Sequence, residues 1–278
     1  MAKSDIYLLG RSSQETERLS EQVQELADEA RWLLDQLHVR PGARALELAC
    51  GPQGVLALLS ERVGPSGTVV GLDSDESLVA SARRYIAEQQ LTNVEVVQGD
   101  ASATNLPKES FDVVFCRLLL VNVPQPERFV EEMVSLLRPG GVIANYEADY
   151  LPHRCDPPSP AWDRLFEIFQ AYARAKGIDL FVGRRLHRML REAGIMELEV
   201  KPTINVYPHG HKRRSVFLDF VQNIRDALVR EGFAKDEELN ELTQELKRHL
   251  DDPHTLVVSH LFFQVWGRKQ DHQGREHE

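Results

Sequence analysis

Residues 43–150 alternate between short apolar stretches and longer amphipathic ones, and this rhythm leaves few folds open to the chain. The pattern predicts strands at 43–49, 68–73, 94–100, 111–120 and 140–150, with helices over 54–63, 76–89 and 126–138. Strands separated by helices of about ten residues or more form parallel βαβ units with right-handed crossovers. We therefore expect an α/β protein with an open, doubly wound sheet.

The chain on either side of this core is predicted to be mainly helical. Ser12 and Glu15 form a capping-box pattern, and the apolar positions that follow indicate one long amphipathic helix up to Leu37. After Tyr150 the patterns predict helices at 161–177, 183–194, 215–232 and 236–250, and strands at 196–208 and 255–269. No internal repeat or linker separates these parts, so a single domain over 1–278 is expected.

Charge and cysteine content exclude several classes of function. The formal net charge is −10, which disfavours nucleic acid as the main partner. The short basic cluster at 211–214 is interpreted as a solvated loop or helix start. Cys50, Cys116 and Cys155 have neither disulfide nor zinc spacing, and no apolar run reaches the roughly 18 residues of a membrane span. These features favour a cytoplasmic protein without a membrane span.

Acidic and small residues follow three successive predicted strands. Glu47 precedes the bare stretch Ala49 to Gly54, Asp73 ends the second strand, and Asp100 ends the third. Ligands of open parallel sheets bind at the carboxyl ends of the strands. A groove lined by these acids suits a ligand that carries an ammonium group, a ribose diol and an adenine amino group.

The stretch Ala49 to Gly54 also approximates a dinucleotide fingerprint, with alanine in place of the first glycine and Asp73 at a suitable distance. An NAD-dependent oxidoreductase is therefore one alternative. However, the Glu47 carboxylate would repel a pyrophosphate. The long helix before the first strand is also atypical of a dinucleotide domain.

Four segments resemble motifs of the class I S-adenosylmethionine (SAM)-dependent methyltransferases: "LELACGPQG", "VVGLDSD", "GDASATNLP" and "LLRPGG". The last is common in the branch with the ubiquinone and menaquinone methyltransferases. The resemblance implies a seven-stranded, mostly parallel sheet whose last strand is antiparallel. It also implies a SAM-binding core in 41–150 and helical substrate-cap insertions in 151–195 and 208–254. From the sequence pattern itself we predict an N-terminal lid or helix in 1–40 and, from its polar composition, a flexible tail in 269–278.

The resemblance assigns the methionine part of SAM to Glu47 and to the backbone of Ala49, Cys50 and Gly51. The family more often has glycine at Ala49, and alanine resists a positive φ. A packing role for the Cys50 side chain is the plainer interpretation.

The same resemblance assigns the ribose hydroxyls to Asp73, the adenine amino group to Asp100 and the adenine ring to the Ala101 amide. Each acid could instead be a helix cap or a solvated strand end. Ser74 lies beside the ribose position, but Ser74 and Asp75 could equally cap the next helix, and we favour that interpretation. Arg117 could contact the cofactor carboxylate or the substrate, or form a surface ion pair.

Methyl transfer requires little chemistry from the protein, because a sulfonium is already an activated donor. A general base helps when the acceptor is a hydroxyl or an acidic carbon. His153 and Tyr150 follow the fifth strand and are the catalytic candidates; His153 could also be a surface loop residue and Tyr150 a pocket wall. His209 and His211 lack a third ligand, so no metal is expected.

The sequence thus predicts a SAM-dependent methyltransferase that acts on O, N or C of a small, partly apolar metabolite. A non-methylating SAM-binding protein and an RNA or protein methyltransferase are the alternatives. The acidic balance disfavours the latter. Whether the protein forms a homodimer is left open.

Overall fold

The computed structural model describes residues 7–9 and 13–270, which build an eight-stranded sheet in the order β3-β2-β1-β4-β5-β8-β6, with β7 paired to β8. The strands are β1 (Arg44–Leu48), β2 (Thr68–Asp73), β3 (Val94–Gln98), β4 (Phe111–Arg117), β5 (Leu137–Asp149), β6 (Arg154–Asp156), β7 (Ile195–Tyr207) and β8 (Leu256–Lys269). Strands β1 to β5 are parallel, and β8 runs antiparallel to β5, β6 and β7. The predicted doubly wound sheet with an antiparallel last strand is confirmed.

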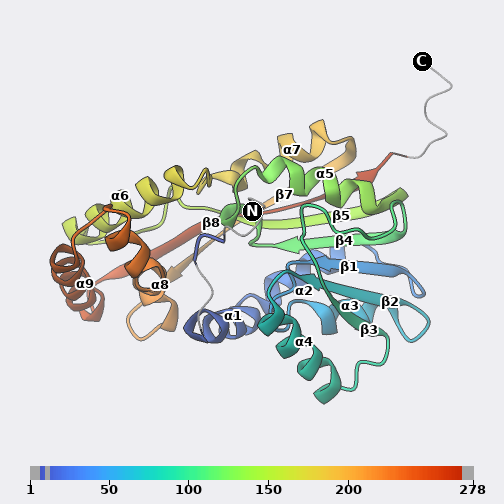
Figure 1. Cartoon of the computed structure of the whole chain (residues 1–278), viewed down its shortest axis with the longest axis horizontal. Helices are drawn as coiled ribbons and strands as arrows, with labels where there is room; N and C mark the ends of the chain where they lie inside the picture. Colours follow the sequence, from blue (N-terminus) through green and yellow to red (C-terminus); the bar gives the residue numbers. More distant parts are fainter. Residues whose placement is uncertain (1–6, 10–12, 271–278) are drawn as a thin grey trace.

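Helices cover both faces of the sheet, with α2, α3 and α4 on one side and α5 and α7 on the other (Figure 1). The helices are α1 (Ser13–Glu25), α2 (Ala27–Gln36), α3 (Leu56–Val63), α4 (Glu76–Glu88), α5 (Pro126–Leu136), α6 (Pro160–Ala175), α7 (Leu186–Glu192), α8 (Val216–Arg230) and α9 (Asp236–Asp251). Because the central strands are covered on both faces, most of their residues are buried, as in β1 and β4.

The single N-terminal helix that the periodicity predicts is broken at Leu26, which has φ of −103° and ψ of 16°. Leu26 is itself buried, so the break lies against the core. It allows α2 to bury Ala30, Leu33 and Leu34 while α1 takes a different course. Ser12, and with it the predicted capping box, lies outside the described residues.

Strand β4 ends three residues earlier than the apolar run 118–120 suggests. Leu118 has a φ of +54°, which turns the chain sharply. The next three amides, of residues 119–121, donate hydrogen bonds to the buried carboxylate of Glu147, from β5. The apolar run 118–120 therefore belongs to a turn around the buried Glu147 carboxylate and not to β4.

The chain after β5 forms a helical cap at one end of the sheet, where α6, α8 and α9 pack together (Figure 1). The short strand β6, which the sequence did not predict, pairs with the beginning of β8. Lys269 is the last residue of β8, and most of the predicted flexible tail lies outside the described residues. No helix within the described ranges is both long and apolar enough to cross a membrane.

Candidate active site

A cavity of about 860 Å³ lies at the carboxyl ends of the central strands, within the ~300–1,000 Å³ usual for small-molecule sites. Its walls come from the turn after β1, the ends of β2, β4 and β5, helices α1, α4 and α8, and strand β8. Of the predicted site residues, the cavity is lined by Ala49, Gly51, Asp73, Ser74, Asp100, Ala101, Arg117 and Tyr150. The sheet therefore brings most of the predicted set to one place.

The turn after β1 forms the floor of the cavity with exposed backbone. Ala49 has a φ of +53° and Gly51 a φ of +60°. A positive φ costs an L-residue such as alanine roughly 1–2 kcal/mol, so the surrounding contacts must hold it. Two of them do: Cys50 N–H donates to the Leu72 carbonyl at 3.1 Å, and Gly51 N–H donates to Asp73 Oδ2 at 2.9 Å. Ala49 thus adopts the positive φ that alanine resists, held by these two hydrogen bonds.

Glu47 and Cys50 do not line the cavity, unlike what the sequence suggests for them. Both side chains are buried beneath the turn. Both carboxylate oxygens of Glu47 accept the Val55 amide, at 2.9 and 2.8 Å, at the start of α3. Burial raises the pKa of Glu47 to about 8, although the nearby Arg117 opposes this. Glu47 therefore shapes the turn from below.

Gly54 is required by this arrangement. A Cβ built there would lie 2.2 Å from Glu47 Oε2, and its φ is +54°. We expect Gly54→Ala to lower the unfolding free energy by roughly 2–4 kcal/mol, since overpacking and a positive φ act together. Urea denaturation measures this. The control is Gly232→Ala, whose φ is also positive but whose Cβ meets nothing within 4 Å; equal losses in both variants would contradict the steric argument.

The raised pKa of Glu47, about 8, has a consequence for stability. Between the ordinary carboxyl pKa of about 4.3 and the folded value, the folded protein holds a proton that the unfolded chain has lost, so stability falls as pH rises. Glu47→Gln, which cannot ionise, should be more stable than the wild type at pH 8, with a smaller difference at pH 5. Thermal unfolding at both pH values checks this; a constant difference would contradict it.

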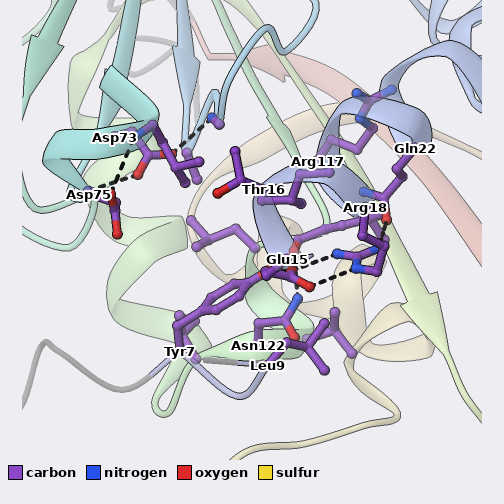
Figure 2. Close-up of a pocket in the computed structure, with 18 of the residues that line it drawn as sticks. Tyr7, Leu9, Glu15, Thr16, Arg18, Gln22, Asp73, Asp75, Arg117 and Asn122 are labelled. Atoms are coloured by element: carbon purple, nitrogen blue, oxygen red, sulfur yellow. Dashed lines mark hydrogen bonds and ion pairs between the residues drawn. The ribbon is translucent and has the colours of Figure 1, made fainter. Parts of the chain in front are cut away.

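The two aspartates at the next strand ends face the cavity and also order their own loops. Asp73 accepts the amides of Gly51 and, through Oδ1, of Asp75 at 3.0 Å (Figure 2). Asp100 accepts the amide and hydroxyl of Ser102, both at 2.8 Å. The helix cap expected at Ser74 or Asp75 is confirmed at Asp75, which accepts the Ser77 and Leu78 amides at the start of α4.

Arg117, at the end of β4, is a cation without a partner in the described part of the chain. Its side chain is half-buried, its Nη1 is fully enclosed without a hydrogen bond, and no ion pair reaches it. Burial lowers its pKa, while Glu47 opposes the shift. An enclosed guanidinium without a counter-charge is costly, so this position favours an anionic ligand group.

Helix α1 forms the opposite wall and is held by a polar network that sequence reasoning did not identify. Glu15 binds Arg18 Nε and Nη2, both at 2.7 Å, and Arg18 Nη1 binds Gln22 at 2.7 Å (Figure 2). Tyr7 and Asn223 also donate to Glu15. The network joins the N-terminal segment, α1 and α8 across the cavity.

Of the two catalytic candidates, Tyr150 lines the cavity, whereas His153 does not. His153 is 3% exposed and packs against Trp162 and His260, with ring centroids 4.9 and 3.9 Å away. Burial lowers its pKa to about 3, so the ring is neutral. The expectation that His153 is a catalytic residue must be corrected, because its side chain is buried among aromatic rings of the cap and does not line the cavity.

His260 is a wall residue that sequence reasoning missed. The residues between β5 and β6 bulge away from β8, because Asp149 pairs with Leu261 and Arg154 with Val258. His260 lies opposite this bulge, with its ring centroid 4.1 Å from that of Tyr150. Burial, then His153 and Arg213, lower its pKa well below the usual value. The place of His260 in the cavity wall follows from the pairing register of β8 with β5 and β6, which local sequence patterns do not predict.

Comparison with known proteins gives a consistent result. A family model described as a methyltransferase domain matches residues 45–141. A demethylmenaquinone methyltransferase from Geobacillus sp. is 31% identical over 197 residues, covering 65% of this chain and 83% of the relative. One from Listeria monocytogenes is 32% identical over 136 residues, covering 49% of this chain and 55% of the relative. The solved YcgJ protein from Bacillus subtilis, 15% identical, covers 88% of this chain and 99% of its own with a TM-score of 0.59, a likeness of fold.

The fold and the cavity define a doubly wound α/β protein with a ligand site at its strand ends. The chain belongs to the class I SAM-dependent methyltransferase family. This relationship replaces the NAD-dependent interpretation, which rested on the glycine pattern alone. The chain spans about half the length of several curated relatives that it matches.

Proposed function

We propose that the protein is an enzyme that transfers a methyl group from SAM to O, N or C of a small, partly apolar metabolite. The observation that carries this proposal is the lining of the cavity. Aspartate carboxylates that could bind a ribose and an adenine lie at the strand ends on one side, and aromatic side chains line the other side. Bound SAM supplies an electrophilic methyl group on a sulfonium. The protein's own contribution is to bind, orient and exclude water.

The cofactor half of the cavity fits SAM by the charge of its lining. Asp73 and Asp100 offer carboxylate acceptors for the ribose hydroxyls and the adenine amino group, with Ala101 beside the latter. The turn from Ala49 to Gly51 has no bulky side chain that would keep the methionine part away. Arg117 offers the guanidinium that a cofactor carboxylate needs, which favours this role over a surface ion pair.

The acceptor half fits a small molecule. Its walls include Tyr150, Phe220, His260 and Phe262, and α1 covers it from the other side. Helices α6, α8 and α9 act in this proposal as the substrate cap, and α1 with the segment before it as the lid. The formal net charge of −10 disfavours RNA as acceptor. Tyr150 is the catalytic candidate that faces the acceptor space, as a pocket wall or phenol donor.

The location and assembly of the protein are proposed from composition. A reducing cytoplasm suits the three cysteines, which are free and buried. A homodimer is compatible with the proposal, and sedimentation analysis would decide it.

The proposal is tested by an acceptor screen that measures S-adenosylhomocysteine formation from SAM. We expect turnover with one class of small, partly apolar acceptors, and tenfold or more slower turnover with Asp73→Ala when SAM is limiting. Tight SAM binding without turnover across such a panel would favour the non-methylating SAM-binding protein instead.

A further inference from the structure

The basic cluster at 211–214 is a helix start, one of the two interpretations that its composition suggests, because a 3-10 turn at Lys212–Ser215 leads into α8; two of its arginines are nevertheless not solvated. Arg213 and Arg214 are only 7% and 5% exposed, while Lys212 is exposed. Arg214 is satisfied by backbone carbonyls, including those of Leu250, Tyr207 and Thr255, so its role is structural. Arg213 is placed differently, because it lines the cavity.

The Arg213 guanidinium is only partly satisfied by the protein. Its Nη1 forms an ion pair with Glu25 of α1 at 2.5 Å. Its Nε is fully enclosed and has no hydrogen-bond partner in the described part of the chain. A buried guanidinium donor without a partner is expensive, which indicates that a ligand group completes it.

A second arginine with an unsatisfied nitrogen points to an anionic acceptor. Arg117 and Arg213 line the same cavity, and each carries an enclosed nitrogen without a partner. SAM has a single carboxylate. If Arg117, beside the cofactor turn, takes that group, then Arg213 is left for the acceptor.

The surroundings of Arg213 define the rest of the acceptor. Arg213, Tyr150 and His260 all line the cavity, and the rings of Tyr150 and His260 lie against each other with their centroids 4.1 Å apart. His260 is buried and held neutral, so it supplies a hydrogen-bonding group and no competing charge. Phe220 and Phe262 add apolar ring surfaces to the same wall. This combination of side chains suits an acceptor molecule with a planar aromatic ring and one negatively charged group.

We propose that the acceptor is an aromatic molecule bearing a carboxylate, and that Arg213 is its anion-binding residue; this inference rests on the proposed function of the cavity. Arg213 recognises the charge, the ring walls recognise the aromatic body, and Tyr150 with His260 provide the remaining polar contacts. The shared chemistry of the class is one anionic oxygen group on a planar ring.

The test uses 2-naphthoate and its neutral amide, 2-naphthamide, titrated calorimetrically into the full chain with saturating S-adenosylhomocysteine and without it. We expect the carboxylate to bind at least tenfold more tightly than the amide, and Arg213→Gln to abolish that preference. Lys212→Gln, an exposed neighbour, should leave it unchanged.

A second variant separates anion binding from a purely structural role. Arg213 also ties the cap to α1 through Glu25. Glu25→Gln breaks that tie but keeps the guanidinium, so carboxylate binding should be retained or strengthened. If Glu25→Gln loses the preference as fully as Arg213→Gln does, or if both probes bind equally or not at all, the inference is overturned. If S-adenosylhomocysteine does not bind, the proposed function is contradicted. The titrations of 2-naphthoate and 2-naphthamide without S-adenosylhomocysteine still decide whether Arg213 binds the carboxylate.

Discussion

Asp73→Ala should weaken S-adenosylhomocysteine binding tenfold or more, which corresponds to about 1.4 kcal/mol or more. The carboxylate faces the cavity and accepts the amides of both Gly51 and Asp75, so its removal disturbs the ribose position and the turn that forms the cavity floor. Because the Asp73 carboxylate forms charge-assisted hydrogen bonds, which are stronger than neutral ones, we expect the affinity to fall by roughly tenfold to a hundredfold. Isothermal titration calorimetry measures it.

The control for this substitution is Asp112→Ala. Asp112 lies near the start of β4, accepts the Arg44 amide and pairs with Arg138, and does not line the cavity. It should lose some stability and keep its cofactor affinity. Unchanged binding by the Asp73 variant would show that the cofactor lies elsewhere.

Arg117→Met should separate stability from binding. Because no described residue neutralises this enclosed guanidinium, replacing it by an apolar chain of similar length should leave the melting temperature of the ligand-free protein unchanged or raise it. The same change removes the partner proposed for the cofactor carboxylate. We therefore expect tenfold or more weaker S-adenosylhomocysteine binding, since a charge-assisted contact in an enclosed site contributes about 1.5–3 kcal/mol.

Calorimetry and thermal unfolding on the same samples test both halves of this prediction. Arg138→Met is the matched control, since Arg138 pairs with Asp112 on the exposed surface away from the cavity. Unaltered affinity in Arg117→Met would contradict the carboxylate role. A large loss of stability would show that the guanidinium supports the fold.

The core of the fold was predictable because parallel strands covered on both faces consist of apolar runs that local patterns detect. The same patterns locate the strand ends, so Asp73, Asp100 and Arg117 could be placed at one edge of the sheet in advance. The positive φ of Ala49 was the expected difficulty, and contacts from β2 hold it.

The acceptor end was much less predictable, because its residues come from distant segments. His260 reaches the cavity only through the register of β8 opposite the chain between β5 and β6. Arg213 has the local composition of a solvated cluster, and only the packing of the cap buries it. His153 follows the fifth strand as expected, but neighbouring aromatic rings enclose it. Local sequence contains none of this information.

The central claim is that the cavity at the strand ends binds SAM. Calorimetric titration of the full chain with SAM, S-adenosylhomocysteine and NADH tests it most directly. The account predicts that the first two bind at one site per chain and that NADH does not bind. Binding of NADH alone, or of none of the three, would contradict it.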